Sequence, residues 1–187
     1  MYLICGLGNP GKKYINTRHN LGFLLIDKLL QNYKFKLIKS NNKRELYKGS
    51  IGDHTCILLK PMTYMNLSGS SVLEVMNFYK IKKSKLYVLH DDIDLKIGKI
   101  KIKIGGGNGG HNGLKSIDAS IGKDYLRLRI GIGHPGNKNL VSTYVLKKFS
   151  KDEEGIIENK LNIINKYFNI IFLNKSLFLT RIAEEKL

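Results

Sequence analysis

The clearest strand signal in the chain is the alternating stretch Lys99-Ile100-Lys101-Ile102-Lys103-Ile104. Because successive side chains of a strand point to opposite faces, this stretch predicts one lysine face and one isoleucine face. A glycine-rich loop follows at residues 105–113, and residues 126–130 (LRLRI) alternate in the same way. We therefore expect two strands that carry basic side chains beside a glycine loop.

Shorter apolar runs predict further strands at residues 2–5, 56–60 and 86–89. Leucines at positions 21, 25 and 29 have helical spacing, and helical patterns return around residues 72–79 and from residue 151 onward. Strands that alternate with helices predict an α/β fold with a twisted, mixed β-sheet flanked by helices. We expect a single domain over residues 1–187, because no linker or low-complexity segment divides it.

The composition indicates a globular protein with a polyanionic partner. The chain has 187 residues, 42% of them hydrophobic, and its 32 Lys and Arg against 15 Asp and Glu give a formal charge of +17. Such a surplus favours nucleic-acid binding. A lysine-rich codon bias could raise the charge in the same way, so the placement of the charges must decide.

Several classes of protein are disfavoured. The two cysteines, Cys5 and Cys56, form neither a C-x-x-C motif nor a disulfide framework, which fits a reducing cytoplasm. No run of eighteen apolar residues predicts a membrane span. Three stretches match G-x-G-x-x-G. The first follows a predicted strand, but the acidic residue that a dinucleotide site requires at the end of a second strand is missing, because the nearest candidate, Asp27, falls in the leucine-striped helix. The second continues into His111-Asn112 and not into the Gly-Lys-Ser/Thr of a nucleotide-binding P-loop.

Polar residues follow the ends of the predicted strands. Asn9, Asn66, Asp91 and Asn112 hold such positions, and His19 falls in the first turn of the leucine-striped helix. Ligands of α/β sheets gather at the carboxyl ends of strands. If these residues converge, an imidazole, a carboxylate and several amides could hydrolyse a substrate without a metal. We expect the positive helix end to keep His19 neutral near pH 7.

Each of these residues also has an ordinary structural explanation. A single histidine is more often packed or solvated than catalytic, and asparagines are common in turns. The acidic stretch at residues 90–94 (HDDID) could hold a hard cation or could simply close a strand, and no typical metal-ligand spacing supports a metal site. The lysine face of residues 99–104 is either a solvated sheet face or a track for a phosphate backbone.

Five blocks of sequence together resemble the bacterial peptidyl-tRNA hydrolases. They are GLGNPG (6–11) with Tyr14 and TRHN (17–20), KPMTYMNLSG (60–69), HDDID (90–94), GGGNGGHNGLK (105–115) and RLRIGIG (127–133). The blocks occur in the order of that family and span most of the first 136 residues. Two departures are a slightly short segment at residues 122–125 and Asp92, where the family often has Glu.

The resemblance implies a single-domain α/β enzyme that is monomeric and uses neither cofactor nor metal. It implies that His19 activates the attacking water, that Asp91 positions His19, and that Asn112 takes part in catalysis. The residues it assigns to peptide and ester binding are Asn9, Tyr14, Met65, Asn66, Gly109, His111 and Asn112. Those it assigns to the tRNA phosphate are Lys101, Lys103 and Arg129.

We therefore predict a cytoplasmic hydrolase that cleaves the ester between the peptide and the 3′-terminal ribose of peptidyl-tRNA. The alternative is a non-catalytic RNA-binding member of the same fold family, against which the retained His19, Asp91 and asparagines argue. A nucleotide-dependent dehydrogenase is a distant third possibility, resting on the glycine motifs alone.

Overall fold

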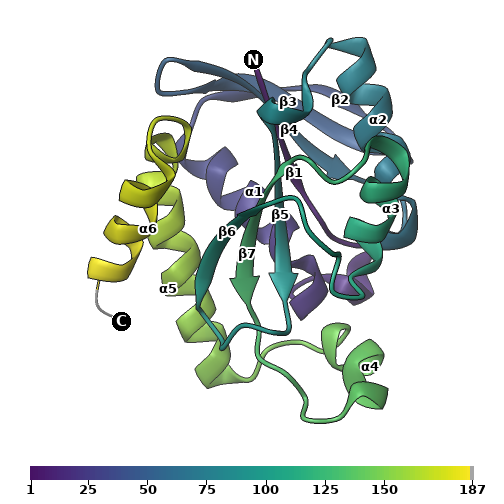
Figure 1. Ribbon diagram of the computed structural model, residues 1–187, viewed down its shortest axis with the longest axis vertical. Helices are drawn as coiled ribbons and strands as arrows, with labels where there is room; N and C mark the ends of the chain where they lie inside the picture. Colours follow the sequence, from purple (N-terminus) through teal and green to yellow (C-terminus); the bar gives the residue numbers. More distant parts are fainter. Residues whose placement is uncertain (186–187) are drawn as a thin grey trace.

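All five residues of strand β1 (Tyr2–Gly6) are buried, because this strand has a neighbour on each side and helices over both faces. The computed structural model describes residues 1–185 of the chain (Figure 1). The other strands are β2 (Phe35–Ser40), β3 (Arg44–Ile51), β4 (His54–Pro61), β5 (Leu86–Asp92), β6 (Ile100–Ile104) and β7 (Leu126–Gly131).

The helices are α1 (Leu21–Asn32), α2 (Ser68–Phe78), α3 (Asn112–Ile121), α4 (Val141–Val145), α5 (Lys151–Tyr167) and α6 (Lys175–Glu184). Short 3₁₀ turns connect them at η1 (Lys12–Tyr14), η2 (Arg18–Asn20), η3 (Met65–Leu67), η4 (Lys83–Lys85), η5 (Lys138–Leu140) and η6 (Phe168–Phe172).

The seven strands lie in the order β2-β3-β4-β1-β5-β7-β6. The central four, β4, β1, β5 and β7, are parallel to one another. The two edge strands, β2 and β6, and the second strand, β3, pair antiparallel with their neighbours. The predicted α/β fold with a mixed sheet is confirmed.

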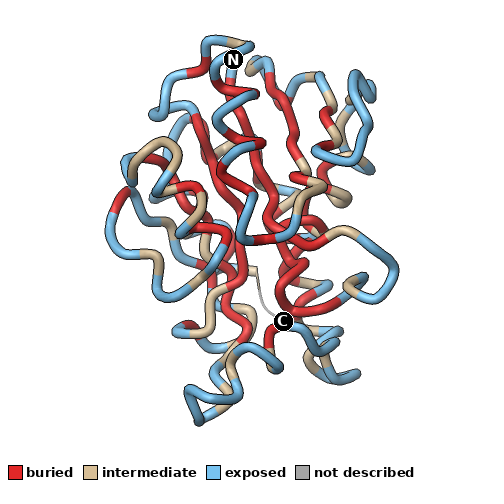
Figure 2. The backbone as a smooth tube through the Cα atoms, turned by 90° about the vertical axis from the view of Figure 1, so that its right-hand side faces the viewer, coloured by how far each residue is buried: buried red, intermediate tan, exposed pale blue. Residues whose placement is uncertain are grey.

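Two apolar clusters cover the two faces of the sheet. Ile4 and Leu89 pack with α1, α5 and α6, whereas Leu3 and Val88 pack with α2 and α3 on the opposite face. The two helical layers are visible on either side of the sheet in Figure 1, and Figure 2 shows the buried strands between them. This alternation follows from the period of two along each strand.

Strands β2 and β3 are not predicted by the sequence patterns. Five of the six residues of β2 are exposed, so the strand carries no alternation of apolar and polar residues that would indicate it. A further difference concerns His19, which lies in η2 ahead of α1 and not in the first turn of that helix. No helix within residues 1–185 has the length and apolar character needed to cross a bilayer.

Helix α1 approaches the sheet so closely that only glycine fits at one of its positions. A Cβ atom on Gly22 would overlap the backbone nitrogen of Leu7 and the backbone oxygen of Leu89. These two residues follow β1 and lie in β5, so Gly22 fixes the distance from α1 to the strand ends that carry Asn9 and Asp91.

We expect Gly22→Ala to lower the free energy of unfolding by about 1–3 kcal/mol, because overpacking against backbone cannot be relieved by a rotamer change. Gly155→Ala is the matched control: it lies in α5 with open space around its Cβ position, and it should raise stability by about 0.5–1 kcal/mol. Urea unfolding of both variants measures the difference, and equal stability of the two would contradict the close approach.

Candidate active site

The site is built around the carboxylate of Asp91 at the end of β5. Asp91 is 2% exposed. Alternate residues of a strand point to the same face of the sheet. Tyr87, Leu89 and Asp91 alternate along β5, so the side chain of Asp91 lies on the α1 side of the sheet. Burial by itself would raise the pKa of Asp91, but the charges of His19 and His111 and their hydrogen bonds outweigh burial and hold this pKa well below its usual range. The carboxylate is therefore ionised and acts only as an acceptor.

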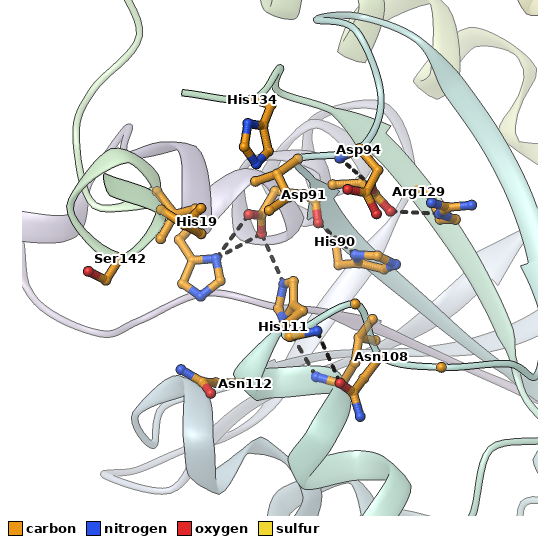
Figure 3. Close-up of a pocket in the computed structure, with 18 of the residues that line it drawn as sticks. His19, His90, Asp91, Asp94, Asn108, His111, Asn112, Arg129, His134 and Ser142 are labelled. Carbon is orange, nitrogen blue, oxygen red and sulfur yellow. Dashed lines mark hydrogen bonds and ion pairs between the residues drawn. The ribbon is translucent and has the colours of Figure 1, made fainter. Parts of the chain in front are cut away.

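His19 is the first partner of this carboxylate. Its Nδ1 lies 3.0 Å from both carboxylate oxygens of Asp91 (Figure 3). Because an ionised carboxylate cannot donate, Nδ1 carries the proton and donates it. The other ring nitrogen, Nε2, is then left with its lone pair, which is the state that a general base requires.

His111 is the second partner, and its tautomer is set by a helix. Its Nδ1 accepts hydrogen bonds from the backbone nitrogens of Gly113 (3.1 Å) and Leu114 (3.4 Å), so the imidazole caps the amino end of α3. An accepting Nδ1 leaves the proton on Nε2, which donates to Asp91 Oδ1 at 3.1 Å. Asp91 thus receives two N–H groups from two imidazoles.

His19, Asp91 and His111 also form a cluster whose ligand atoms lie within 4.8 Å of one another, as a metal site would require. The chemistry of His111 opposes that use. A metal on Nε2 would move the proton to Nδ1, where it would face the backbone N–H groups of Gly113 and Leu114. Keeping the cap would require an imidazolate, so the donor set does not suit a divalent metal.

The pKa of His19 is shifted upward, whereas the positive end of a helix would shift it downward. Burial lowers the pKa of His19, but the charge of Asp91 and the hydrogen bond to it outweigh burial, and the net shift is upward. The nearby carboxylate is a full charge at hydrogen-bond distance, whereas a helix end contributes only a partial charge. The carboxylate, and not the helix end, therefore sets the direction of the shift in the pKa of His19.

Asn9 is held in place by two neighbours. Its backbone nitrogen and oxygen bond the side-chain amide of Asn20, at 2.9 Å each. Its own Oδ1 accepts from the backbone nitrogen of Met65 at 2.9 Å. Asn9 and Met65 are buried, whereas Asn66, the next residue in η3, is exposed. The link between Asn9 and Met65 joins the ends of β1 and β4.

A cavity of about 670 Å³ opens beside the two histidines. The predicted site residues that line it are His19, Asp91, Lys103, Gly109, His111, Asn112 and Arg129. The predicted residues that are not part of its lining are Asn9, Tyr14, Met65, Asn66 and Lys101. The structure thus gathers the histidines and Asp91 around one cavity (Figure 3), while Asn9 and Met65 adjoin this group through Asn20, the neighbour of His19.

The remaining wall of the cavity is not anticipated by the sequence patterns. It comes from residues 134–145, including Val141, Ser142 and Val145 of α4. His90 also lines the cavity, with its Nδ1 2.7 Å from the backbone oxygen of Asp91. Burial lowers the pKa of His90 to about 3, so this ring stays neutral.

A basic edge formed by Lys101, Lys103, Arg127 and Arg129 adjoins the cavity. Lys101 lies opposite Arg129 and Lys103 opposite Arg127 across the antiparallel pair β6–β7. Like charges directly opposite each other are destabilising unless something offsets them. Arg127 is neutralised by Asp118 at 2.9 Å, and Arg129 bonds Asp92 through Nε at 2.6 Å. The two exposed lysines remain to attract an anion.

Comparison with known proteins gives consistent results. The sequence profile of the family described as peptidyl-tRNA hydrolase matches residues 3–185. A peptidyl-tRNA hydrolase of Rickettsia bellii (strain RML369-C) is 50% identical over 176 residues, which is 94% of this chain and 95% of that protein. A peptidyl-tRNA hydrolase of Sinorhizobium fredii is 49% identical over 88% of this chain and 69% of its own length.

A solved structure also matches. The crystal structure of peptidyl-tRNA hydrolase from Acinetobacter baumannii superposes with a TM-score of 0.92 at 39% sequence identity. The match covers 100% of this chain and 96% of that chain.

The pairing of His19 with Asp91 makes a prediction about titration. We expect the His19 imidazole to titrate above its ordinary value of 6.5, because the carboxylate stabilises the protonated ring. In Asp91→Asn the charge is lost but burial remains, so the pKa of His19 should fall below 6.5. NMR titration of the imidazole resonances measures both values, and a pKa that is the same in both proteins would contradict the pairing.

Proposed function

The chain belongs to the peptidyl-tRNA hydrolase family, and we propose that His19 is the general base with which it cleaves its substrate. The reaction is the hydrolysis of peptidyl-tRNA, which releases the tRNA for translation, and the protein is an ester hydrolase. The observation that carries the assignment of the base is the bond from Nδ1 of His19 to Asp91, which leaves Nε2 free to accept a proton.

In the proposed mechanism a water molecule lies between Nε2 of His19 and the carbonyl carbon of the ester. Nε2 takes a proton from the water as its oxygen bonds to that carbon. The resulting imidazolium is stabilised by the Asp91 carboxylate. When the carbon–oxygen bond to the ribose breaks, the imidazolium returns the proton to the ribose oxygen, which leaves a peptide carboxylic acid and free tRNA.

We assign the oxyanion that forms on the ester carbonyl to the carboxamide of Asn112. Asn112 is exposed, begins α3 and lines the same cavity as His19, so its amide group is available to a ligand. The residues proposed to hold the peptide and the ester are Asn9, Tyr14, Met65, Asn66, Gly109 and His111. The fixed contact between Asn9 and Met65 supports a preorganised site for the peptide backbone.

We assign the phosphate end of the tRNA to Lys101, Lys103 and Arg129. Lys103 and Arg129 line the cavity, and Lys101 faces Arg129 from the neighbouring strand. The bond from Arg129 Nε to Asp92 leaves the two terminal amino groups of the guanidinium for a phosphate, which Arg binds in fork geometry.

We further propose that the protein acts without a metal, as a monomer of one domain over residues 1–187, in the cytoplasm. The capping role of His111 supports metal independence. The two apolar clusters on opposite faces of one sheet support a single domain. Both cysteines are free thiols, as a reducing compartment allows. The alternative of a non-catalytic RNA-binding relative is not favoured, because the pair of His19 and Asp91 is intact.

The decisive experiment measures release of tRNA from peptidyl-tRNA in the presence of a metal chelator. We expect full turnover by the wild type and a loss of about 10²–10⁴-fold in kcat for His19→Ala, because general-base catalysis is worth that much. The control is His54→Gln. His54 begins β4, so it lies at the amino ends of the parallel strands, whereas the cavity lies at their carboxyl ends. Near-normal turnover in His19→Ala would refute the assignment of the base, and loss of activity with chelator would refute metal independence.

A second experiment tests the phosphate site. Lys103→Ala and Arg129→Ala should each weaken substrate binding. Each should also make the dependence of the logarithm of the binding constant on the logarithm of the salt concentration less steep, by about 0.7–0.9 for each phosphate contact removed. Lys36→Ala removes the same charge from exposed strand β2, at the other edge of the sheet from β6. If all three variants change the slope equally, the binding reflects net charge and not a phosphate site.

A further inference from the structure

Arg18, the residue before His19, is a buried arginine that the proposed mechanism does not use. Its side chain is 8% exposed, although it carries a full charge. Buried charges are retained where they are paired and hydrogen-bonded. All the side-chain partners of Arg18 come from one segment, residues 144–153, which leads from α4 into α5.

The contacts between Arg18 and this segment are numerous and specific. Nη1 donates to the backbone oxygens of Lys147 (3.3 Å) and Lys148 (2.7 Å). Nη2 forms an ion pair with Glu153 at 2.6 Å. The guanidinium also lies over the rings of Tyr144 and Phe149, with centroid distances of 4.2 and 5.2 Å. Lysine could not reproduce this set, because it lacks the planar fork and the stacking surface.

The segment that Arg18 holds overlaps and continues the cavity wall formed by residues 134–145. Val141, Ser142 and Val145 of α4 line the cavity together with His19. Helix α4 has only five residues, of which Val145 alone is buried. So short a helix is not stable by itself and depends on outside contacts.

The wall is also held by apolar packing, since Val145 belongs to the core on the α1 side of the sheet and Val141 and Tyr144 pack against that core. The hydroxyl of Tyr144 donates to the backbone oxygen of Ile132 at 2.6 Å. The backbone nitrogen of Arg18 donates to Lys147 O at 3.1 Å, and Thr17 forms an isolated bridge with Lys148. Residues 17–18 thus join the segment just after α4, at Lys147 and Lys148, to the part of the chain that leads directly into His19.

We propose that Arg18 is a positioning residue that fixes the α4 wall relative to His19, so that substrate between them is held at the base. The effect on substrate binding beside the base rests on the proposed role of His19. Its structural part stands on the contacts of Arg18 alone. One pair of adjacent residues then serves two tasks, since His19 faces Asp91 while Arg18 holds the opposite wall.

The test compares Arg18→Lys with Arg44→Lys. Arg44 is an equally buried arginine of β3, ion-paired with Glu74 of α2, and lies outside the cavity. We expect Arg18→Lys to raise KM roughly tenfold with kcat nearly unchanged, because it removes binding shared by the ground and transition states. The pH profile of kcat should be unchanged, since the bond between His19 and Asp91 is not altered. Arg44→Lys should leave KM unchanged even if it lowers the melting temperature.

Amide hydrogen exchange of the free protein provides a readout that needs no activity. Exchange in residues 139–148 should accelerate at least tenfold in Arg18→Lys and stay unchanged in Arg44→Lys. Glu153→Gln keeps the shape of the ion-pair partner and should accelerate exchange in the same residues by a smaller factor. This variant replaces Arg18→Lys in the test if Arg18→Lys does not fold. An unchanged KM, unchanged local exchange, or acceleration spread over the whole molecule would overturn the inference. A fully active His19→Ala would refute the base and leave the exchange result standing.

Discussion

The candidate site depends on one buried carboxylate that accepts hydrogen bonds from two imidazoles. Asp91 has almost no contact with solvent, so its charge is tolerable only because His19 and His111 donate to it. The same bonds orient both rings and determine which nitrogen of each ring carries the proton. For His19 this leaves Nε2 as an acceptor, and for His111 it leaves Nδ1 to cap α3. The bonds to Asp91 and the cap on α3 therefore agree in placing the proton of His111 on Nε2.

The sheet determines why these groups meet. Because β4, β1 and β5 are parallel, their carboxyl ends lie on the same side of the sheet. Asp91 lies at the end of β5, and Met65 and Asn9 lie in the segments that follow β4 and β1. The glycine at position 22 lets α1 approach the strand ends closely enough for η2 to place His19 against Asp91. Packing and chemistry are coupled here, because the helix that Gly22 allows to approach Leu7 and Leu89 follows directly after the turn that carries His19.

The basic edge and the histidines that contact Asp91 adjoin the same cavity but differ in their electrostatics. Arg127 and Arg129 have carboxylate partners, whereas Lys101 and Lys103 are exposed on the adjacent strand. Charges at this edge attract a polyanion over a distance of about a Debye length, roughly 8–10 Å at physiological salt. The histidines are buried and respond mainly to Asp91. The proposed attraction of the tRNA and the proposed activation of water therefore rest on different residues, which mutation can alter separately.

The sequence by itself determined the α/β class, the five strands that are buried or alternate, and the polar residues near their ends. One strand end differs, since β5 continues past the predicted end at residue 89 and includes Asp91. Periodicity along a strand is a local property, and the motifs around His19, Asp91 and Asn112 are local too. It did not reveal β2, since five of its six residues are exposed, or β3, whose buried apolar residues Leu46 and Ile51 are too few and too far apart to form a pattern. Only the tertiary structure decided the upward pKa shift of His19, the capping role of His111 and the contribution of α4 to the cavity. These depend on the distance between residues far apart in the chain, such as positions 19 and 91, or 18 and 148, and no local pattern encodes such a distance.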